Sequence, residues 1–293
     1  MAEENSSLTT ALREEAFAFV RSLANELSEG KVELPCFPEV ALKVRRALDD
    51  ESVTVARIAT ILGAEAGLAA RVLVMANSAA LGYSGKPVTD LHTAVTRIGL
   101  SNVRTAALAF ALGQLRRAVQ FKHIMQDLER FWRQSTKVAA LGRVLALRIP
   151  GVNADLAMLA GLLHNIGAVY ILARAGAGAG VIRQTELREM LLKDWSATIG
   201  RSIAENWGLQ EEVVEAIGQQ FDVDRARRGS ADLSDVQSVA VANADQVGME
   251  QGVDSSVDFR IALGSLGLDE SSGARIIEES NASLAALQAA LSG

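Results

Sequence analysis

The sequence predicts an all-α protein, a bundle of many helices, on three observations. Apolar residues make up 49% of the 293 residues and aromatic residues only 4%, so small and aliphatic side chains must fill the core, as in packed helices. Apolar residues recur at helical spacing along most of the chain, and no stretch alternates apolar and polar residues as a half-buried strand would. The four prolines stand where helical patterns start or stop: Pro35, Pro38, Pro87 and Pro150.

The N-terminal part begins with an acidic amphipathic helix. Residues 8–29 have one apolar side, and Gly30 is a suitable C-terminal stop for them. The segment 34–38 contains two prolines and is expected to lead in extended form into the next helix. Ser52 or Thr54 can cap the helix after that.

The rest of the chain is predicted to form a series of helices with recognisable ends. They are expected at about residues 54–63, 67–77, 90–98, 102–117, 128–144, 155–166, 184–193, 195–207, 210–220, 233–248, 258–266 and 270–291. Thr89 or Asp90 can cap one of these helices and Asn153 or Asp155 another, while Gly99 interrupts the apolar pattern between two of them.

Charge and cysteine content exclude several classes of protein. The net charge of −6 argues against a general nucleic-acid binder, which usually carries a basic surplus. The single cysteine, Cys36, cannot form an intrachain disulfide or a cysteine-based zinc site. Residues 1–10 lack the features of a signal peptide, and the apolar stretch 105–115 is too short to span a membrane. We therefore expect a soluble cytoplasmic protein that binds no nucleic acid and does not insert into a membrane.

The heptapeptide at residues 161–167, Gly-Leu-Leu-His-Asn-Ile-Gly, is the most informative stretch of the chain. It looks like the metal-binding His-Asp signature of a helical phosphohydrolase in which Asn165 stands in place of the aspartate. An amide oxygen is neutral and a weaker metal ligand than a carboxylate. Gly161 and Gly167 would then serve close helix packing and helix termination.

Several short segments together resemble the HDOD family, the HD-related output domain of bacterial signalling proteins. They follow the family's order over about residues 30–250 and include Leu34-Pro35-x-Phe37-Pro38, Leu73-x-x-Ala76-Asn77-Ser78, Ala94-Val95-x-x-Ile98-Gly99, Phe131-Trp132-x-x-Ser135, the heptapeptide and Ile203-Ala204-x-x-Trp207-x-Leu209. The family is a degenerate relative of the HD and HD-GYP metal-dependent phosphohydrolases. The resemblance therefore implies an all-α, HD-like bundle of two helical lobes.

The resemblance, together with a loosening of the helical pattern at 118–127, divides the chain into four parts. They are an N-terminal helix (1–29), an N-terminal lobe (30–125), a degenerate HD-like lobe (126–250) and a C-terminal helical extension (251–293).

Compared with the HD motif position by position, this chain has lost most of the metal ligands. Gln134 stands near the early histidine of the motif, and Asn165 stands at the paired aspartate, so only His164 and Asp245 match as ordinary ligands. In the region where binuclear relatives have further histidines, this sequence has Trp195, Gln219 and Gln220. A catalytic metal needs about four to six ligands in one place. We therefore expect no cofactor, no catalytic metal and no phosphohydrolase activity; any residual metal binding would use His164 and Asp245.

Two interpretations of His164 follow. It is either a core histidine, hydrogen-bonded to Asp245 or to a backbone carbonyl, or part of a retained polar pocket. The residues expected to line that vestigial pocket are Arg133, Gln134, His164, Asn165 and Asp245. In such a pocket, Arg133 could attract a phosphate-bearing ligand.

The resemblance implies a non-catalytic regulatory role in bacterial signal transduction. The protein would act as an interaction or output module on a signalling partner that the sequence does not identify. Two alternatives stay open. One is a metal-dependent phosphohydrolase that uses His164 and Asp245, and the other is a sensor that binds a nucleotide or another small anionic ligand in the vestigial pocket.

Overall fold

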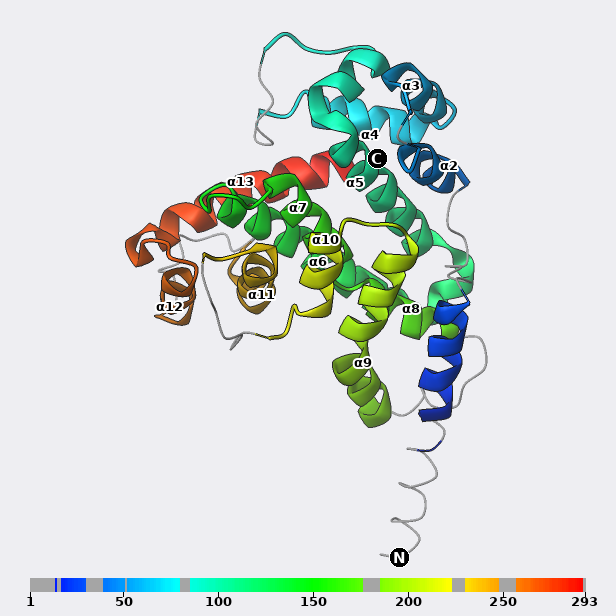
Figure 1. Ribbon diagram of the computed structural model, residues 1–293, viewed down its shortest axis with the longest axis vertical. Helices are drawn as coiled ribbons and strands as arrows, with labels where there is room; N and C mark the ends of the chain where they lie inside the picture. Colours follow the sequence, from blue (N-terminus) through cyan, green and yellow to red (C-terminus); the bar gives the residue numbers. More distant parts are fainter. Residues whose placement is uncertain are drawn as a thin grey trace, which may run out of the picture.

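The computed structural model describes residues 14, 17–29, 39–50, 52–79, 85–175, 185–222, 230–247 and 257–291. Within these ranges every regular element is a helix, so the predicted all-α fold is confirmed (Figure 1). The predicted stop at Gly30, the segment 34–38 and Cys36 lie outside the described residues.

The N-terminal lobe consists of short helices packed against one long helix. α2 (Glu39–Leu48), α3 (Val55–Gly63) and α4 (Ala66–Ala76) lie against α5 (Leu91–Arg117), in the upper part of Figure 1. Their shared core includes Val44, Ile58, Leu62, Leu68, Val72, Val95, Val103 and Phe110.

Side-chain caps begin α3 and α5 at positions that the sequence predicted. The Thr54 hydroxyl accepts the backbone N–H of Arg57 at 3.2 Å, and the Asp90 carboxylate accepts that of Thr93 at 2.8 Å. These two bonds decide the capping alternatives in favour of Thr54 and Asp90. The predicted interruption at Gly99 is a kink within α5, where Gly99 adopts φ 77°, a conformation that costs glycine little.

The second lobe follows a short 3₁₀ segment, η2 (Val119–Ile124). It contains α6 (Met125–Ala146), α7 (Ala154–Leu163), α8 (Ile166–Ala175), α9 (Thr185–Asn206), α10 (Glu211–Gly218), α11 (Leu233–Asn243) and the 3₁₀ turn η4 (Ala244–Gln246). α6 and α7 pack closely because Gly161 has no side chain: a Cβ there would lie 2.5 Å from the Cα of Ala139. Asn153 caps α7 by accepting the backbone N–H of Asp155 at 2.9 Å.

The helices predicted over residues 184–193, 195–207 and 233–248 have different limits in the structure. Residues 184–193 and 195–207 were expected to form two helices, but α9 is continuous. Lys193 and Asp194 lie in the middle of α9 with exposed side chains, so their charges stay hydrated and do not interrupt the helix. The helix expected over 233–248 ends at Asn243, which places Asp245 in η4.

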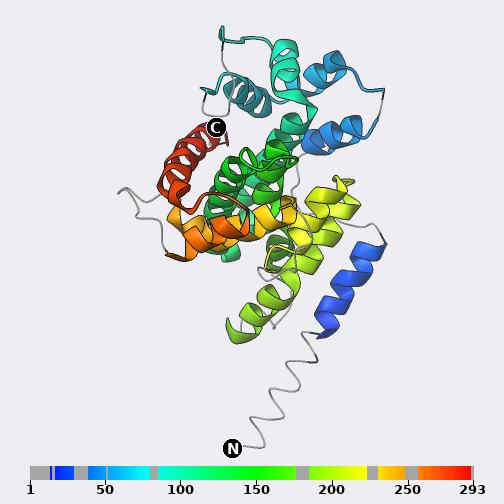
Figure 2. The ribbon, with the colours of Figure 1, turned by 60° about the vertical axis from the view of Figure 1, so that its left-hand side comes forward.

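The helices at the two ends of the chain are attached differently. The helix over 17–28 lies beside α8 and α9, where Glu26 accepts hydrogen bonds from Tyr170 at 3.0 Å and from Arg174 at 2.5 Å (Figures 1 and 2). After α12 (Val257–Ser265) and the 3₁₀ turn η5 (Glu270–Ser272), α13 (Gly273–Leu291) runs from the second lobe to the first. Its side chains enter both hydrophobic cores: Ile276, Ile277 and Leu284 the larger one, Leu287 and Ala290 the other. The limits of the four predicted parts stay a prediction.

One apolar segment is longer than the sequence analysis allowed. Residues Ala154–Ala175, which comprise α7 and α8, are long and apolar enough to cross a membrane, but 94% of the apolar window is buried inside the fold. The sequence analysis considered uninterrupted apolar stretches only, and Asp155, His164, Asn165 and Arg174 interrupt this segment. Burial among other helices is the usual position of such a segment in a protein core.

Candidate functional site

The heptapeptide forms a junction between two helices. A single helix through Ile166 was expected, but α7 ends at Leu163 and α8 begins at Ile166, which leaves His164 and Asn165 between them. At this point, two side chains form hydrogen bonds with backbone carbonyl groups. The His164 imidazole contacts the carbonyl of Gly161, and the Gln220 amide donates to the carbonyl of His164 at 3.0 Å. These contacts compete with the backbone bonds that would continue α7.

The glycines of the heptapeptide provide the close approach that the sequence predicted. A Cβ at Gly167 would lie 2.0 Å from the carbonyl oxygen of Ser196 and 2.6 Å from the amide nitrogen of Gly200, so α8 and α9 nearly touch there. Gly167 lies in the first turn of α8, however, and does not terminate a helix as predicted. Its missing side chain is what allows the two helices to cross at this distance.

His164 is a buried histidine with one partnered nitrogen. Its side chain is 1% exposed, and Nδ1 lies 2.7 Å from the carbonyl oxygen of Gly161. Nδ1 must therefore carry the proton, which leaves Nε2 as a bare acceptor. Nε2 has no hydrogen-bond partner among the described residues. The carbonyl alternative of the sequence analysis is confirmed, and the predicted bond to Asp245 is wrong because Asp245 lies exposed in η4.

Burial controls the charge of this imidazole. Loss of hydration lowers the pKa of His164 from 6.5 to about 4, and the hydrogen bond to Gly161 opposes that shift only in part. His164 is consequently neutral at physiological pH and presents an unprotonated nitrogen.

Gln134 and Asn165 are the residues that the resemblance aligns with a histidine and an aspartate of the HD motif. The Asn165 amide donates to the Gln134 side-chain oxygen at 3.3 Å, which joins α6 to the α7–α8 junction. Two side chains that would share a metal ion in the motif thus contact each other directly. The side chains at these two positions are therefore both neutral amides.

The remaining donors do not fit a catalytic metal ion. His164 Nε2 and the Asp245 carboxylate are the ordinary ligands at the expected positions, and Asp245 is exposed. Over the described ranges, no three His, Cys, Asp or Glu side chains are grouped so that they could hold a metal ion. Trp195 faces the N-terminal helix, and Gln219 donates to Glu215 at 2.5 Å, so neither adds a ligand.

All five residues predicted for the vestigial pocket line one cavity of about 710 Å³, which we call the open cavity. They are Arg133, Gln134, His164, Asn165 and Asp245. The sequence analysis missed the other polar and aromatic residues of its wall: Arg130, Lys137, Glu189, Lys193, Ser196 and Phe221. Helical spacing was the available signal, because Arg130 and Lys137 lie three residues from Arg133 and Gln134 on the same face of α6.

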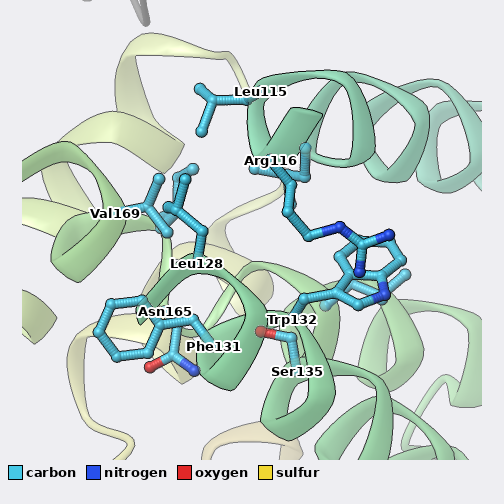
Figure 3. Close-up of a pocket in the computed structure, with 11 residues that line it drawn as sticks. Leu115, Arg116, Leu128, Phe131, Trp132, Ser135, Asn165 and Val169 are labelled. Carbon is cyan, nitrogen blue, oxygen red and sulfur yellow. The ribbon is translucent and has the colours of Figure 1, made fainter. Parts of the chain in front are cut away.

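A second, much smaller cavity lies on the other side of the junction. It measures about 30 Å³ and is lined mainly by apolar side chains, with Arg116, Ser135 and Asn165 as polar exceptions (Figure 3). The Arg116 guanidinium lies over the ring of Trp132 at 5.0 Å, as Figure 3 shows. Phe131 and Asn165 line both cavities and therefore separate them.

The fold and this junction are those of an HD-like helical domain. The HDOD domain family matches residues 34–223, which is more than half of the chain. This chain therefore belongs to the HDOD family.

Solved structures with the same fold carry different descriptions. A structure from Shewanella amazonensis SB2B, described as "Putative metal-dependent phosphohydrolase", has a TM-score of 0.72 and 25% sequence identity, and covers 95% of this chain and 99% of its own. A structure from Marinobacter aquaeolei VT8, described as "Putative signal transduction protein", has a TM-score of 0.58 and 23% identity, and covers 97% of this chain and 66% of its own.

A curated relative comes from Treponema pallidum (strain Nichols). It is 24% identical over 234 residues, which cover 75% of this chain and 44% of the relative. This chain thus spans less than half the length of that protein.

Proposed function

We propose that this protein is a non-catalytic regulatory member of the HDOD family that acts in bacterial signal transduction. It would work by binding, as an interaction or output module, and would not hydrolyse phosphoesters. The observation that carries this proposal is the hydrogen bond between Asn165 and Gln134, because it joins two amides at the positions of two metal ligands.

The chemistry of hydrolysis supports the same proposal. In an HD site the metal ion lowers the pKa of a bound water and neutralises phosphoryl oxygens, and it needs several charged or imidazole ligands to stay in place. One imidazole nitrogen and one exposed carboxylate are too few for that task. The description of the Marinobacter structure as a signal transduction protein agrees with a regulatory role.

A metal-dependent phosphohydrolase is the second candidate, and one feature favours it. His164 Nδ1 is bound to a backbone carbonyl and Nε2 is free, which is how metal-ligating histidines are usually oriented. The Shewanella structure also carries a phosphohydrolase description.

A comparison of the wild type with a variant that restores the motif tests the two candidates. The purified wild-type protein should contain substoichiometric Mn²⁺, Fe²⁺ or Zn²⁺ by elemental analysis and should not hydrolyse p-nitrophenyl phosphate when these ions are added. The double variant Gln134→His/Asn165→Asp should bind Mn²⁺ more tightly than the wild type, because two strong ligands replace two weak ones. Stoichiometric metal together with turnover in the wild type would overturn the proposal.

A further inference from the structure

We infer that the open cavity is a binding site for a small phosphate-bearing ligand of the nucleotide class. This inference rests on the proposed function, since a regulatory protein can bind such a ligand without consuming it. It adds the chemical class of the ligand and names the groups that recognise it.

The cations of the cavity are the first support. Arg133 and Lys137 reach it from one face of α6, and Lys193 reaches it from α9. None of these three side chains has an ion-pair or hydrogen-bond partner among the described residues. Arg130 adds a fourth cation, which is weakly paired with Asp127 at 3.4 Å. Unpaired cations that converge on one cavity favour an anion, and phosphate takes both guanidinium and ammonium donors.

The buried imidazole is the second support. His164 Nε2 is an acceptor without a donor in a side chain that is 1% exposed and lines the cavity. A buried acceptor that lacks a partner is destabilising, so a ligand that brings a donor is stabilised there. A nucleoside phosphate can meet the cations with its phosphate group and at the same time satisfy Nε2 with a sugar hydroxyl or a ring N–H. The site therefore favours an organic phosphate over the bare ion.

The shape and composition of the cavity are the third support. Its volume of about 710 Å³ lies within the range of roughly 300–1,000 Å³ that is usual for small-molecule sites. Phe221 lies in its wall and is 54% exposed, so one face of its ring is available for stacking on a base. Glu189 and Asp245 supply carboxylate oxygens that can accept sugar hydroxyls. Cations, an aromatic ring and acceptors together match a nucleoside phosphate better than a purely apolar or purely anionic molecule.

Calorimetric titration of the whole protein tests the inference. The probes are AMP, GMP, CMP and UMP, with ribose 5-phosphate, inorganic phosphate and the unphosphorylated nucleosides as comparisons. At least one nucleoside monophosphate should bind, its nucleoside should bind at least about tenfold more weakly, and inorganic phosphate should bind more weakly than the nucleotide. Affinity should fall as salt increases, because exposed cations are screened.

Two variants locate the binding. Arg133→Gln/Lys193→Gln removes two exposed cations of the cavity and should weaken nucleotide binding at least about tenfold. Arg260→Gln on α12 removes an exposed cation that does not line the cavity, and it should leave the affinity unchanged. Equal affinity in the wild type and the double variant would overturn the inference, and so would the absence of binding by every nucleotide up to about 1 mM.

The imidazole is tested without mutating it. On addition of the bound nucleotide, the ¹⁵N resonance of His164 Nε2 should move in the direction of a nitrogen that accepts a hydrogen bond. Variants His92→Gln and His123→Gln identify the two other imidazoles of the chain. An unmoved Nε2 signal in the nucleotide complex would remove His164 from the recognition site.

The same titration separates failure of this inference from failure of the proposed function. Absence of binding would overturn the ligand site and leave the non-catalytic role intact. Release of phosphate from the bound nucleotide would support the cavity as a phosphate site and would overturn the non-catalytic role.

Discussion

The two sides of the His164–Asn165 junction have opposite properties. On one side, which we call the closed side, Gly161 and Gly167 let α7 and α8 approach α6 and α9 so closely that no methyl group fits. On the other side, the cavity of about 710 Å³ is lined by charged side chains, several of which have no partner among the described residues. The heptapeptide therefore combines two glycines that the packing of the helices requires with two polar residues, His164 and Asn165, that line a cavity. A sequence signature can identify a fold without identifying an activity, because packing and chemistry depend on different residues.

The largest effect is expected on the closed side. Gly167→Val should prevent folding or cost more than about 4 kcal/mol, because its Cβ would lie 2.0 Å from a backbone oxygen of α9 that cannot move independently. Circular dichroism and urea denaturation measure this cost. Gly63→Ala is the matched control, since a Cβ there meets only the side chain of Leu91 at 3.6 Å and should be tolerated. A stable Gly167→Val protein would show that the closed side has room to adjust.

An intermediate effect is expected from pH at the junction itself. The pKa of His164 is about 4 in the folded protein and near 6.5 when unfolded, so the unfolded chain binds more protons between these values. The stability that depends on His164 is therefore present above pH 6.5 and is lost as the pH falls toward 4. At pH 5 the loss should be about 2 kcal/mol relative to pH 7.5.

The variant His164→Gln isolates this contribution, since glutamine keeps an N–H donor and does not titrate. Urea denaturation at both pH values should show that the wild type loses about 2 kcal/mol more than the variant. Identical pH dependence in the two proteins would mean that His164 is hydrated in solution.

The smallest effect on stability is expected on the open side. Arg133→Gln/Lys193→Gln should change the free energy of unfolding by less than about 0.5 kcal/mol, because both side chains are exposed and neither has a partner among the described residues. A gain in stability at low salt would fit mutual repulsion among the cations of the cavity. A loss of several kcal/mol would contradict the comparison, since the open side would then also hold the fold together.

Local signals allowed much of the fold to be predicted from the sequence. The caps at Thr54, Asp90 and Asn153 and the kink at Gly99 are set by residues close to them in the chain, so their chemistry could be recognised there. The break between α7 and α8 was not recognised, because one of the two side-chain bonds at this point comes from Gln220, 56 residues away.

The candidate site was predictable only in part. Resemblance to a motif brought together five residues that do line one cavity. Lys193 was missed because its place at the cavity depends on where α9 lies relative to α6, which no local pattern encodes. Asp245 was one of the two partners expected for His164, but α11 ends at Asn243 and Asp245 lies exposed in η4.

The position of α13 has a consequence for how the protein is made. This helix spans Gly273–Leu291, and its side chains complete the hydrophobic cores of both lobes. During translation, the earlier helices leave the ribosome well before it does. Apolar surface in both lobes thus stays uncovered until residue 291 has emerged from the exit tunnel, a period in which chaperones have the best access to the nascent chain.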